Sequence, residues 1–245
     1  MYSLYFQKLK DLFDIIEKKE ANNISLAAEK IAQCIRQDGV IHVFGCGHSH
    51  MLGEEIFYRA GGLLPINPIL FEDLMLHKGA LRSSQLERQN DFGHVVMENV
   101  QVEPNDILIV VSTSGRNPVP IDVAEIAKQR GAYVIAITSV VYRESVTSRH
   151  KQGKFLADVA DLAIDNHITV GDALMEHPAI PVPFGSGSTI VGMMIINGMI
   201  VEATNLMIEH NFIPPIYRSG NIDGSEDHNN HLINKYKKRI PQLGN

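Results

Sequence analysis

The chain has 245 residues, with 22 lysines and arginines against 28 aspartates and glutamates, 44% hydrophobic residues, two cysteines and eleven histidines. This length suits one large α/β domain with extensions or two small domains, and the apolar fraction excludes a disordered or fibrous protein. The net charge of −6 and the lack of a lysine- and arginine-rich block argue against a nucleic-acid-binding surface. Composition therefore indicates a packed globular protein.

The cysteines and the apolar segments bear on the cellular compartment. Cys34 and Cys46 do not make a disulfide framework in a chain of this length, which favours a reducing compartment. Residues 1–10 lack the continuous apolar region of a signal peptide. The longest apolar run, Ile190 to Val201, is shorter than the roughly 20 residues that cross a bilayer. We therefore expect a cytoplasmic protein that binds neither a membrane nor a nucleic acid.

Two helices are predicted before the first strand. From Tyr2 to Arg36, apolar residues recur at spacings of three and four. The Asn22–Asn23 step is expected to separate the two helices, with Ser25 as the cap of the second. A short strand, Val40 to Phe44, then ends at a glycine turn.

Strands and helices alternate from there to about His210. The predicted elements are a helix over Ser49–Ala60, a strand within Leu63–Phe71, a strand over Asp106–Val111, a helix over Pro118–Arg130, strands over Ala132–Ile137 and Leu162–Asp165, and a long helix from Ser188 to His210. The run at 106–111, in which every residue after Asp106 is apolar and most are β-branched, is typical of a strand buried on both faces. The alternation predicts an α/β fold with a doubly wound parallel sheet flanked by helices. Loops are expected at 71–104 and at Pro178–Pro183, and in a tail from Pro214.

Two polar loops directly follow strands, which is where an open parallel sheet binds its ligands. The glycine loop, Gly45–Ser49, follows the first strand, and the serine loop, Ser112–Asn117, follows the third. Three hydroxyl residues, a glycine and a helix starting at Pro118 bring O–H and N–H donors to a positive helix end. This pattern predicts a phosphate-monoester site, and the alternative is a simple helix cap. The hydroxyl cluster Ser186–Thr189, before the last helix, is either an N-cap or part of the same site.

Nucleotide-binding motifs fit the two loops less well. The dinucleotide pattern G-x-G-x-x-G requires glycine where His50 stands, and no G-K-[ST] follows a strand. Nucleotide binding is therefore a secondary interpretation.

The succession of these motifs resembles the SIS (sugar isomerase) family of phosphosugar-binding domains. The resemblance covers residues 24–210 and rests on G-x-G-x-S (Gly45, Gly47, Ser49), on S-x-S-G-R-x-P (Ser112, Ser114, Gly115, Arg116, Pro118) and on the strand end Thr138–Ser139. The whole chain resembles a group of bacterial SIS proteins labelled as phosphoheptose isomerases. Its S-G-R-x-P loop is most similar to that of the N-acetylmuramic acid 6-phosphate etherases.

The resemblance implies a five-stranded, flavodoxin-like Rossmann-type sheet, a homodimer or dimer of dimers, and a sugar phosphate held by both loops. The residues expected to bind it are Gly45, Gly47, Ser49, Ser112, Thr113, Ser114, Asn117 and Ser188. Asn117 stands where the family commonly has a further serine or threonine, and its amide can still donate a hydrogen bond. The chain then divides into an N-terminal helical segment that packs on the core (1–36), a SIS domain (37–212) and a C-terminal extension (213–245).

Aldose–ketose isomerisation and lactyl-ether elimination both begin with removal of a proton next to a carbonyl, so both require a base. Glu87 falls near the place where the etherases keep theirs. On the helix after the glycine loop, etherases and heptose isomerases have a glutamate where this chain has Arg59. Either Glu54 or Glu55 replaces it, with Glu55 as the candidate, or both are surface charges.

Histidine side chains are the alternative groups for proton transfer. His48 and His50 flank Ser49, and we expect at least one, His48, to face the cleft. A metal site made of these two with His228 and His231, joined by Glu226 or Asp227, is the alternative. The tail histidines are otherwise surface or interface residues, or belong to a segment that reaches a partner's site, as the resemblance suggests. We expect no metal and no cofactor.

The predicted function is that of a phosphosugar-binding protein, an aldose–ketose sugar-phosphate isomerase that transfers a proton next to the carbonyl. The alternatives are an amino-sugar-phosphate lyase or etherase and a non-catalytic phosphosugar sensor. Lack of an N-terminal helix-turn-helix segment argues against a DNA-binding regulator. The helix from Ser188 to Met207 is apolar on nearly every face through Val201, which independently favours a dimer.

Overall fold

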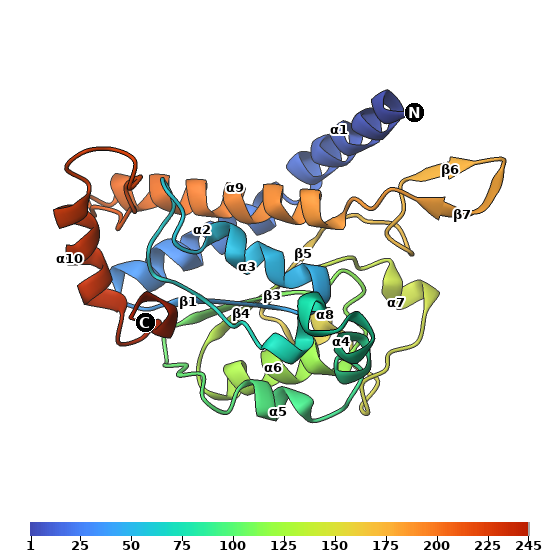
Figure 1. Ribbon diagram of the computed structural model, residues 1–245, viewed down its shortest axis with the longest axis horizontal. Helices are drawn as coiled ribbons and strands as arrows, with labels where there is room; N and C mark the ends of the chain where they lie inside the picture. Colours follow the sequence, from blue (N-terminus) through green and yellow to red (C-terminus); the bar gives the residue numbers. More distant parts are fainter. Residues whose placement is uncertain (245) are drawn as a thin grey trace.

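A five-stranded parallel sheet with helices on both faces forms the centre of the structure, a computed structural model that describes residues 1–244 (Figure 1). The strands lie in the order β2-β1-β3-β4-β5 and span Ile41–Gly45 (β1), Ile66–Pro68 (β2), Ile107–Val111 (β3), Tyr133–Thr138 (β4) and Leu162–Asp165 (β5). This is the flavodoxin-like order, in which the chain reverses direction across the sheet between β1 and β3. The predicted doubly wound, five-stranded parallel sheet is confirmed.

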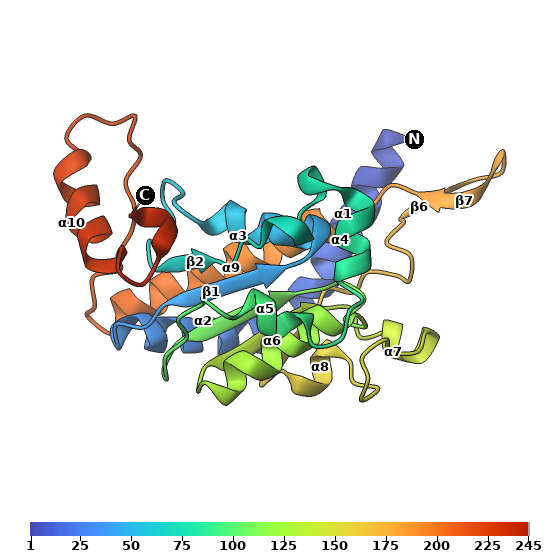
Figure 2. The same cartoon turned by 60° about the horizontal axis from the view of Figure 1, so that its bottom comes forward.

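Side chains of each strand alternate between the two faces of the sheet, and each face fills its own hydrophobic core. In β3, Ile107, Ile109 and Val111 belong to one core, and Leu108 and Val110 to the other. The first face is covered by α2 (Ala21–Arg36), α3 (Met51–Ile56) and α9 (Ser188–Glu209), and the second by α5 (Phe92–Val96), α6 (Pro118–Gln129) and α8 (Leu156–Val159) (Figure 2). Because both faces are covered, every position of β3 is apolar.

Short elements surround the carboxyl ends of the strands. These are the 3-10 turns η1 (Gly47–His50), η2 (Glu72–Leu74) and η3 (Leu76–Lys78), with the helices α4 (Ala80–Leu86) and α7 (Tyr142–Ser145). At the other end, α10 (Glu226–Tyr236) and the turn η4 (Pro241–Leu243) pack on the amino ends of β1 and β2, where Val40, Leu64, Tyr236 and Ile240 are buried together.

The first helix and a late hairpin project from the body on the same side (Figure 1). They are α1 (Tyr2–Lys19) and the antiparallel pair β6 (Met175–His177) and β7 (Ile180–Phe184). The hydroxyl of Tyr5 donates to the carbonyl of Ser186 at 2.6 Å, so α1 contacts the segment that follows the hairpin.

The N-terminal helices separate two residues earlier than predicted. α1 ends at Lys19 and α2 begins at Ala21, so Ser25 lies inside α2 instead of capping it. The carboxylate of Glu20 accepts a hydrogen bond from the amide of Asn23 at 2.8 Å. This bond satisfies a polar side chain of the first turn, so Asn22–Asn23 does not break the helix.

Three predicted loops contain regular structure. Residues 71–104 hold α4 and α5, the tail holds α10, and Pro178–Pro183 lies within the β6–β7 hairpin. The prolines of β7 made this segment look like a loop in the sequence. A two-stranded hairpin tolerates proline because the outer edge of each strand pairs with no further strand. The strand in the apolar segment 63–71 comprises only Ile66–Pro68, and α3 ends at Ile56, before the predicted Ala60, because Phe57 is extended.

Helix α9 is long and apolar enough, by length and composition, to cross a membrane. The sequence analysis considered only the apolar run 190–201, whereas the whole helix has 22 residues and meets this criterion. In the structure α9 packs against α2 and α3, and Val191, Ile195, Met199 and Met207 are buried. These contacts account for the apolar inner face of α9.

Candidate functional site

The glycine loop and the serine loop lie side by side at the carboxyl end of the sheet. β1 and β3 are hydrogen-bonded neighbours, and Gly45 is in register with Val111. Both loops therefore leave the sheet at the same level, on adjacent strands about 4.8 Å apart. This is also the point where the strand order reverses, which is where doubly wound sheets bind ligands.

A close backbone approach shapes the glycine loop. A Cβ on Gly45 would lie 2.6 Å from the carbonyl carbon of Ser49 and 2.7 Å from its Cβ. The Ser49 N–H donates to the carbonyl of Cys46 at 3.0 Å. Glycine at position 45 thus lets the chain fold back, so that Ser49 lies against the end of β1.

The histidines of the glycine loop have different surroundings. His48 is exposed on η1. His50 is held locally, because Nδ1 contacts the carbonyl of Gly47 and Nε2 lies 3.5 Å from a carboxylate oxygen of Glu54. Of the two, His48 is therefore the one free to meet a ligand.

Glu55 faces α9 and not the serine loop. Its Oε1 accepts a hydrogen bond from the amide of Asn197 at 3.2 Å, and its Oε2 pairs with Arg59 at 3.0 Å. Arg59, which stands at the position of the expected glutamate, is thus paired with Glu55, the residue predicted to replace that glutamate. The structure does not bring Glu55 together with the other candidates.

The serine loop is held by the ends of the next two strands. The carbonyl of Thr113 accepts the N–H of Ser139 at 2.9 Å, and the hydroxyl of Thr113 lies 3.4 Å from the amide nitrogen of Asn166. Gly115 has a φ of 58°, and a Cβ there would lie 2.7 Å from the hydroxyl of Thr138. Sequence analysis did not include Ser139 or Asn166 in the site, although each directly follows a strand.

Several backbone N–H groups of the serine loop are unpaired in the described part of the chain. Within residues 1–244, the N–H groups of Thr113, Ser114, Arg116 and Asn117 have no hydrogen-bond acceptor. Asn117 is the N-cap of α6, but the described residues include no side-chain capping bond at this helix. A row of open N–H groups before a helix N-terminus suits an anion.

A cavity opens beside the loop on the β4 side. It has a volume of about 330 Å³ and is lined by Ser114, Gly115, Thr138, Ser139, Arg143 and Phe155, among others. Ser114 thus borders open space, whereas Ser112 is buried and its hydroxyl accepts the N–H of Gly115 at 3.3 Å.

Glu87 lies against the first turn of α6, directly after α4. Its carbonyl oxygen accepts the N–H of Val119 at 3.3 Å. Burial raises the pKa of its carboxyl above the usual 4.5, while a hydrogen bond from Asn117 and the charges of Arg88 and Arg149 act in the opposite direction. A half-buried carboxyl with a raised pKa, next to open N–H donors, is suited to act as a general base.

Three arginines gather around Glu87 and the serine loop. Arg149 donates to the side-chain oxygen of Asn117 at 2.9 Å, and its backbone N–H donates to the carbonyl of Arg116 at the same distance. Burial, and then the positive charges of Arg116 and Arg88, lower the pKa of Arg149. The Nε of Arg116 is buried and has no partner among the described residues. This local positive charge favours an anionic ligand in a protein of negative net charge.

At the start of α9, an internal carboxylate occupies the helix end. Asp172 accepts the N–H groups of Gly187 and Ser188 at 3.0 and 2.9 Å, and the hydroxyl of Ser188 at 2.6 Å. A carboxylate at this position satisfies N–H groups and the helix dipole. In this structure the hydroxyl of Ser188 therefore serves the helix cap.

The other chemically reactive side chains lie in different settings. Among residues 1–244, no group of three or more His, Cys, Asp or Glu side chains is placed to hold a metal ion. Helix α10, which carries His228, lies far from α4 in both views (Figures 1 and 2). Nε2 of His228 contacts the carbonyl of Ile216 at 2.8 Å. Burial, and then the charge of Glu87, raise the pKa of the Cys46 thiol well above 9.0, so Cys46 is not a thiolate at neutral pH.

Solved structures with the same fold include phosphoheptose isomerases. That of Neisseria gonorrhoeae has a TM-score of 0.55 and 19% identity, with 83% of this chain and 97% of that one covered. That of Francisella tularensis has a TM-score of 0.55 and 15% identity, with coverages of 82% and 95%. At these identities the likeness shows the fold alone.

Relatives in sequence cover almost the whole chain. A UPF0309 protein of Halalkalibacterium halodurans is 53% identical over 243 residues, which are 99% of this chain and 97% of the relative. One from Geobacillus sp. strain WCH70 is 54% identical over 243 residues, with coverages of 99% and 98%. The family model of the SIS domain matches residues 4–139, which include both loops and Glu87. The chain therefore belongs to the SIS domain family.

Proposed function

We propose that the protein binds a sugar phosphate at the glycine and serine loops and isomerises it between aldose and ketose. The observation that supports this best is the serine loop, where open N–H groups and hydroxyls precede α6 and Glu87 lies against the same helix turn. The fold shared with two phosphoheptose isomerases agrees with this proposal.

In this proposal the phosphate group lies before the N-terminus of α6. Hydroxyls of Ser112, Thr113 and Ser114, the loop N–H groups and the amide of Asn117 donate to its oxygens. Gly45, Gly47 and Ser49 border it from β1, the neighbouring strand. The positive charge of the three arginines offsets the charge of the phosphate.

Glu87 is the proposed base. As a carboxylate it removes the proton from the carbon next to the carbonyl and returns it to the former carbonyl carbon, with an enediol between the two steps. A second proton moves between the two sugar oxygens, and His48, exposed beside Ser49, is the proposed carrier. The roles of Glu55 and Ser188 stay predictions. Their observed contacts do not support these roles, because Glu55 is hydrogen-bonded to α9 and Ser188 to Asp172.

The arginines favour a second candidate, an amino-sugar-phosphate lyase or etherase. In that reaction the same base removes the proton next to the carbonyl, and an ether oxygen on the following carbon leaves with its lactyl group. Arg88, Arg116 and Arg149 would hold the lactyl carboxylate. A phosphosugar sensor would use the same loops without turnover.

These functions are separated by incubating the protein with heptulose, hexosamine and muramic acid phosphates in deuterium oxide. Isomerisation replaces a C–H by C–D and yields a new isomer by NMR, whereas elimination releases lactate. Thermal protection without either product indicates a sensor and contradicts the enzyme assignment. If no compound protects the protein or is converted, phosphosugar binding itself is wrong.

We also propose that the protein is a cytoplasmic homodimer, alone or as a dimer of dimers. On α1, Tyr2, Leu4 and Phe6 are 74%, 52% and 54% exposed, and on α9 Val201 and Ile208 are exposed too. Apolar side chains on a projecting helix suit burial against a second copy. The two buried free thiols, Cys34 and Cys46, agree with a reducing compartment.

A further inference from the structure

Asn117 lies between the proposed base and the arginines of the site. It is the last residue of the serine loop and the N-cap of α6, and it is only 9% exposed. In the proposed function its amide donates to the phosphate, but its side chain also has two protein contacts, with Arg149 and with Glu87. A residue that only bound phosphate would not require these contacts.

The contact with Arg149 fixes the orientation of the Asn117 amide. Nη1 of Arg149 lies 2.9 Å from Oδ1 of Asn117. An arginine side chain has donors and no acceptor, so the amide oxygen, and not the nitrogen, must face it. The amide nitrogen, with its two N–H groups, is therefore left to donate elsewhere.

Glu87 is the acceptor for this nitrogen. A hydrogen bond from the Asn117 side chain acts to lower the pKa of the Glu87 carboxyl, against the larger effect of burial. The backbone of Glu87 is held as well, because its carbonyl accepts the N–H of Val119 in the first turn of α6 at 3.3 Å. Glu87 is thus tied to the start of α6 through both its backbone and its carboxyl group.

The segment that carries Arg149 is anchored on both sides of this residue. The backbone N–H of Arg149 donates to the carbonyl of Arg116 at 2.9 Å, and the hydroxyl of Ser148 accepts the N–H of His150 at 3.0 Å. His150 is only 4% exposed, and its Nε2 lies 3.3 Å from a carboxylate oxygen of Asp122 on α6. The side chain of Arg149 is exposed, but its backbone is therefore fixed relative to the serine loop.

We propose that Asn117 is a positioning residue: Arg149 orients its amide, and one amide N–H holds the carboxylate of Glu87 in place for proton removal. The second N–H stays available to the phosphate, so one side chain connects the base to the anion site. The catalytic purpose of this arrangement rests on the proposed function, whereas the contacts themselves do not. A serine or threonine, which the family commonly has here, carries a single O–H donor and cannot donate to both groups.

Other charged groups near Glu87 act on it without touching Asn117. The charges of Arg88 and Arg149 act on the pKa of Glu87 in the same direction as the Asn117 hydrogen bond, and the charge of Glu87 in turn reaches the thiol of Cys46 on the glycine loop. By charge, Arg88 acts on Glu87 at least as strongly as Arg149 does. Among residues 1–244, however, Arg149 donates to Asn117 and Arg88 does not. The two arginines therefore separate an effect of charge from an effect on the amide.

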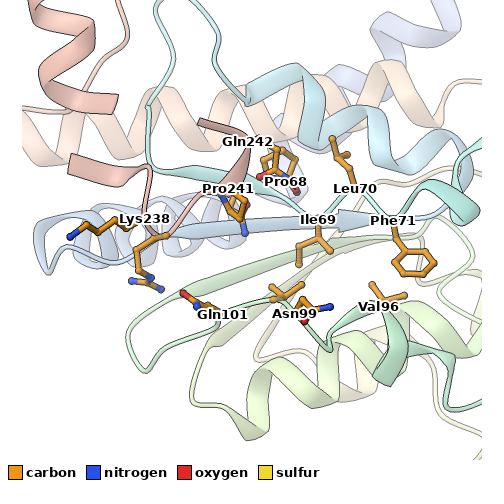
Figure 3. A pocket seen from close by; sticks show the side chains of 13 residues that line it. Pro68, Ile69, Leu70, Phe71, Val96, Asn99, Gln101, Lys238, Pro241 and Gln242 are labelled. Carbon is orange, nitrogen blue, oxygen red and sulfur yellow. Dashed lines mark hydrogen bonds between the residues drawn. The ribbon is translucent and has the colours of Figure 1, made fainter. Parts of the chain in front are cut away.

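The test is a carbon-13 NMR titration of the Glu87 carboxyl carbon in the full chain without ligand, with its signal assigned by its loss in Glu87→Gln. Asn117→Ala removes a hydrogen bond to the charged form, so the acid dissociation constant of Glu87 should fall at least about tenfold. The control is Asn99→Ala, which alters an exposed asparagine in a separate cavity of about 250 Å³ along β2 and should change nothing (Figure 3). That cavity is lined by neither loop and not by Glu87. An unchanged constant in a folded Asn117→Ala protein overturns the proposal.

Two arginine variants test the orienting role and leave Asn117 in place. Arg149→Met should lower the acid dissociation constant of Glu87 by more than Arg88→Met does, because it removes a charge and also the contact with Asn117. In the Asn117→Ala background the effect of Arg149→Met should shrink, since no amide is left to orient. An equal or larger effect of Arg88→Met, or the same effect of Arg149→Met in both backgrounds, means that Arg149 acts by charge alone and contradicts the proposal.

Turnover gives an independent measurement. The acid limb of the pH profile of kcat/KM follows ionisation of the base in the free enzyme, so this limb should move to higher pH in Asn117→Ala. A limb that stays in place overturns the positioning role. If the wild-type protein converts no sugar phosphate, the proposed function fails, and the titration of Glu87 still decides whether Asn117 holds its carboxylate.

Discussion

Replacing Gly45 by alanine should displace the glycine loop by steric contact alone. Gly45 does not have a positive φ, so the backbone preference of alanine is not the obstacle. The added Cβ would lie 2.6 Å from the carbonyl carbon of Ser49, whereas ordinary contacts begin at 3.4 Å. The backbone at Ser49 must therefore move by most of an ångström.

Overpacking of this kind costs about 1–3 kcal/mol of stability. The displacement also moves Ser49 away from the proposed phosphate, and losing one hydrogen bond to a charged group weakens binding by roughly 10- to 150-fold. Gly198→Ala is the control, because a Cβ there meets nothing within 4 Å and α9 should gain about 0.5–1 kcal/mol.

The assays are urea unfolding, for the midpoint, and calorimetric titration with a sugar phosphate that protects the wild-type protein. We expect Gly45→Ala to lower both midpoint and affinity, and Gly198→Ala to lower neither. A Gly45→Ala protein with the midpoint and affinity of the wild type would refute the close approach of Gly45 to Ser49.

Four further outcomes are expected. Glu87→Gln should keep ligand binding and remove turnover, and an unchanged kcat would exclude Glu87 as the base. Because burial raises the pKa of Glu87, its ionised form destabilises the folded state at neutral pH, so Glu87→Gln should raise the urea midpoint at pH 7 and lose this gain below pH 4.5. Asp172→Ala should destabilise the protein by about 1–2 kcal/mol, and Asp172→Asn by less, because asparagine keeps a cap oxygen and tolerates the φ of 50°. Sedimentation at micromolar concentration should give a dimer or tetramer, and a monomer would contradict the proposed interface.

The sheet and the two loops were predictable because their signals are local. The run Ile107–Val111 and the glycine turn after β1 each carry strand and turn chemistry within a few residues. Neighbouring parallel strands then place both loops at one edge without further information. The nearness of Glu87 to the serine loop was different, because the 24 residues between Glu87 and Ser112 carry no motif that fixes their spacing, and only the family resemblance pointed to it.

Contacts between distant segments account for what sequence analysis missed. Arg149 reaches Asn117 from the irregular stretch after α7, and Asp172 reaches Ser188 across the β6–β7 hairpin. Neither residue belongs to a periodic pattern, so nothing local marks its partner. Glu55 shows the converse case: it lies within two helix turns of the glycine loop, where a site residue is expected, and in the structure its carboxylate contacts Asn197 of α9.

One titration decides whether the serine loop is the phosphate site. Ser112→Ala with Ser114→Ala is compared with Ser145→Ala, which alters an exposed serine of α7 outside the loop. Calorimetry with a protecting sugar phosphate, on variants shown to be folded by their urea midpoints, measures the change in affinity. Loss of two hydrogen bonds to a charged group predicts an affinity at least about 100-fold lower in the double variant and unchanged in Ser145→Ala. Full affinity in a folded double variant would contradict phosphate binding by the serine loop.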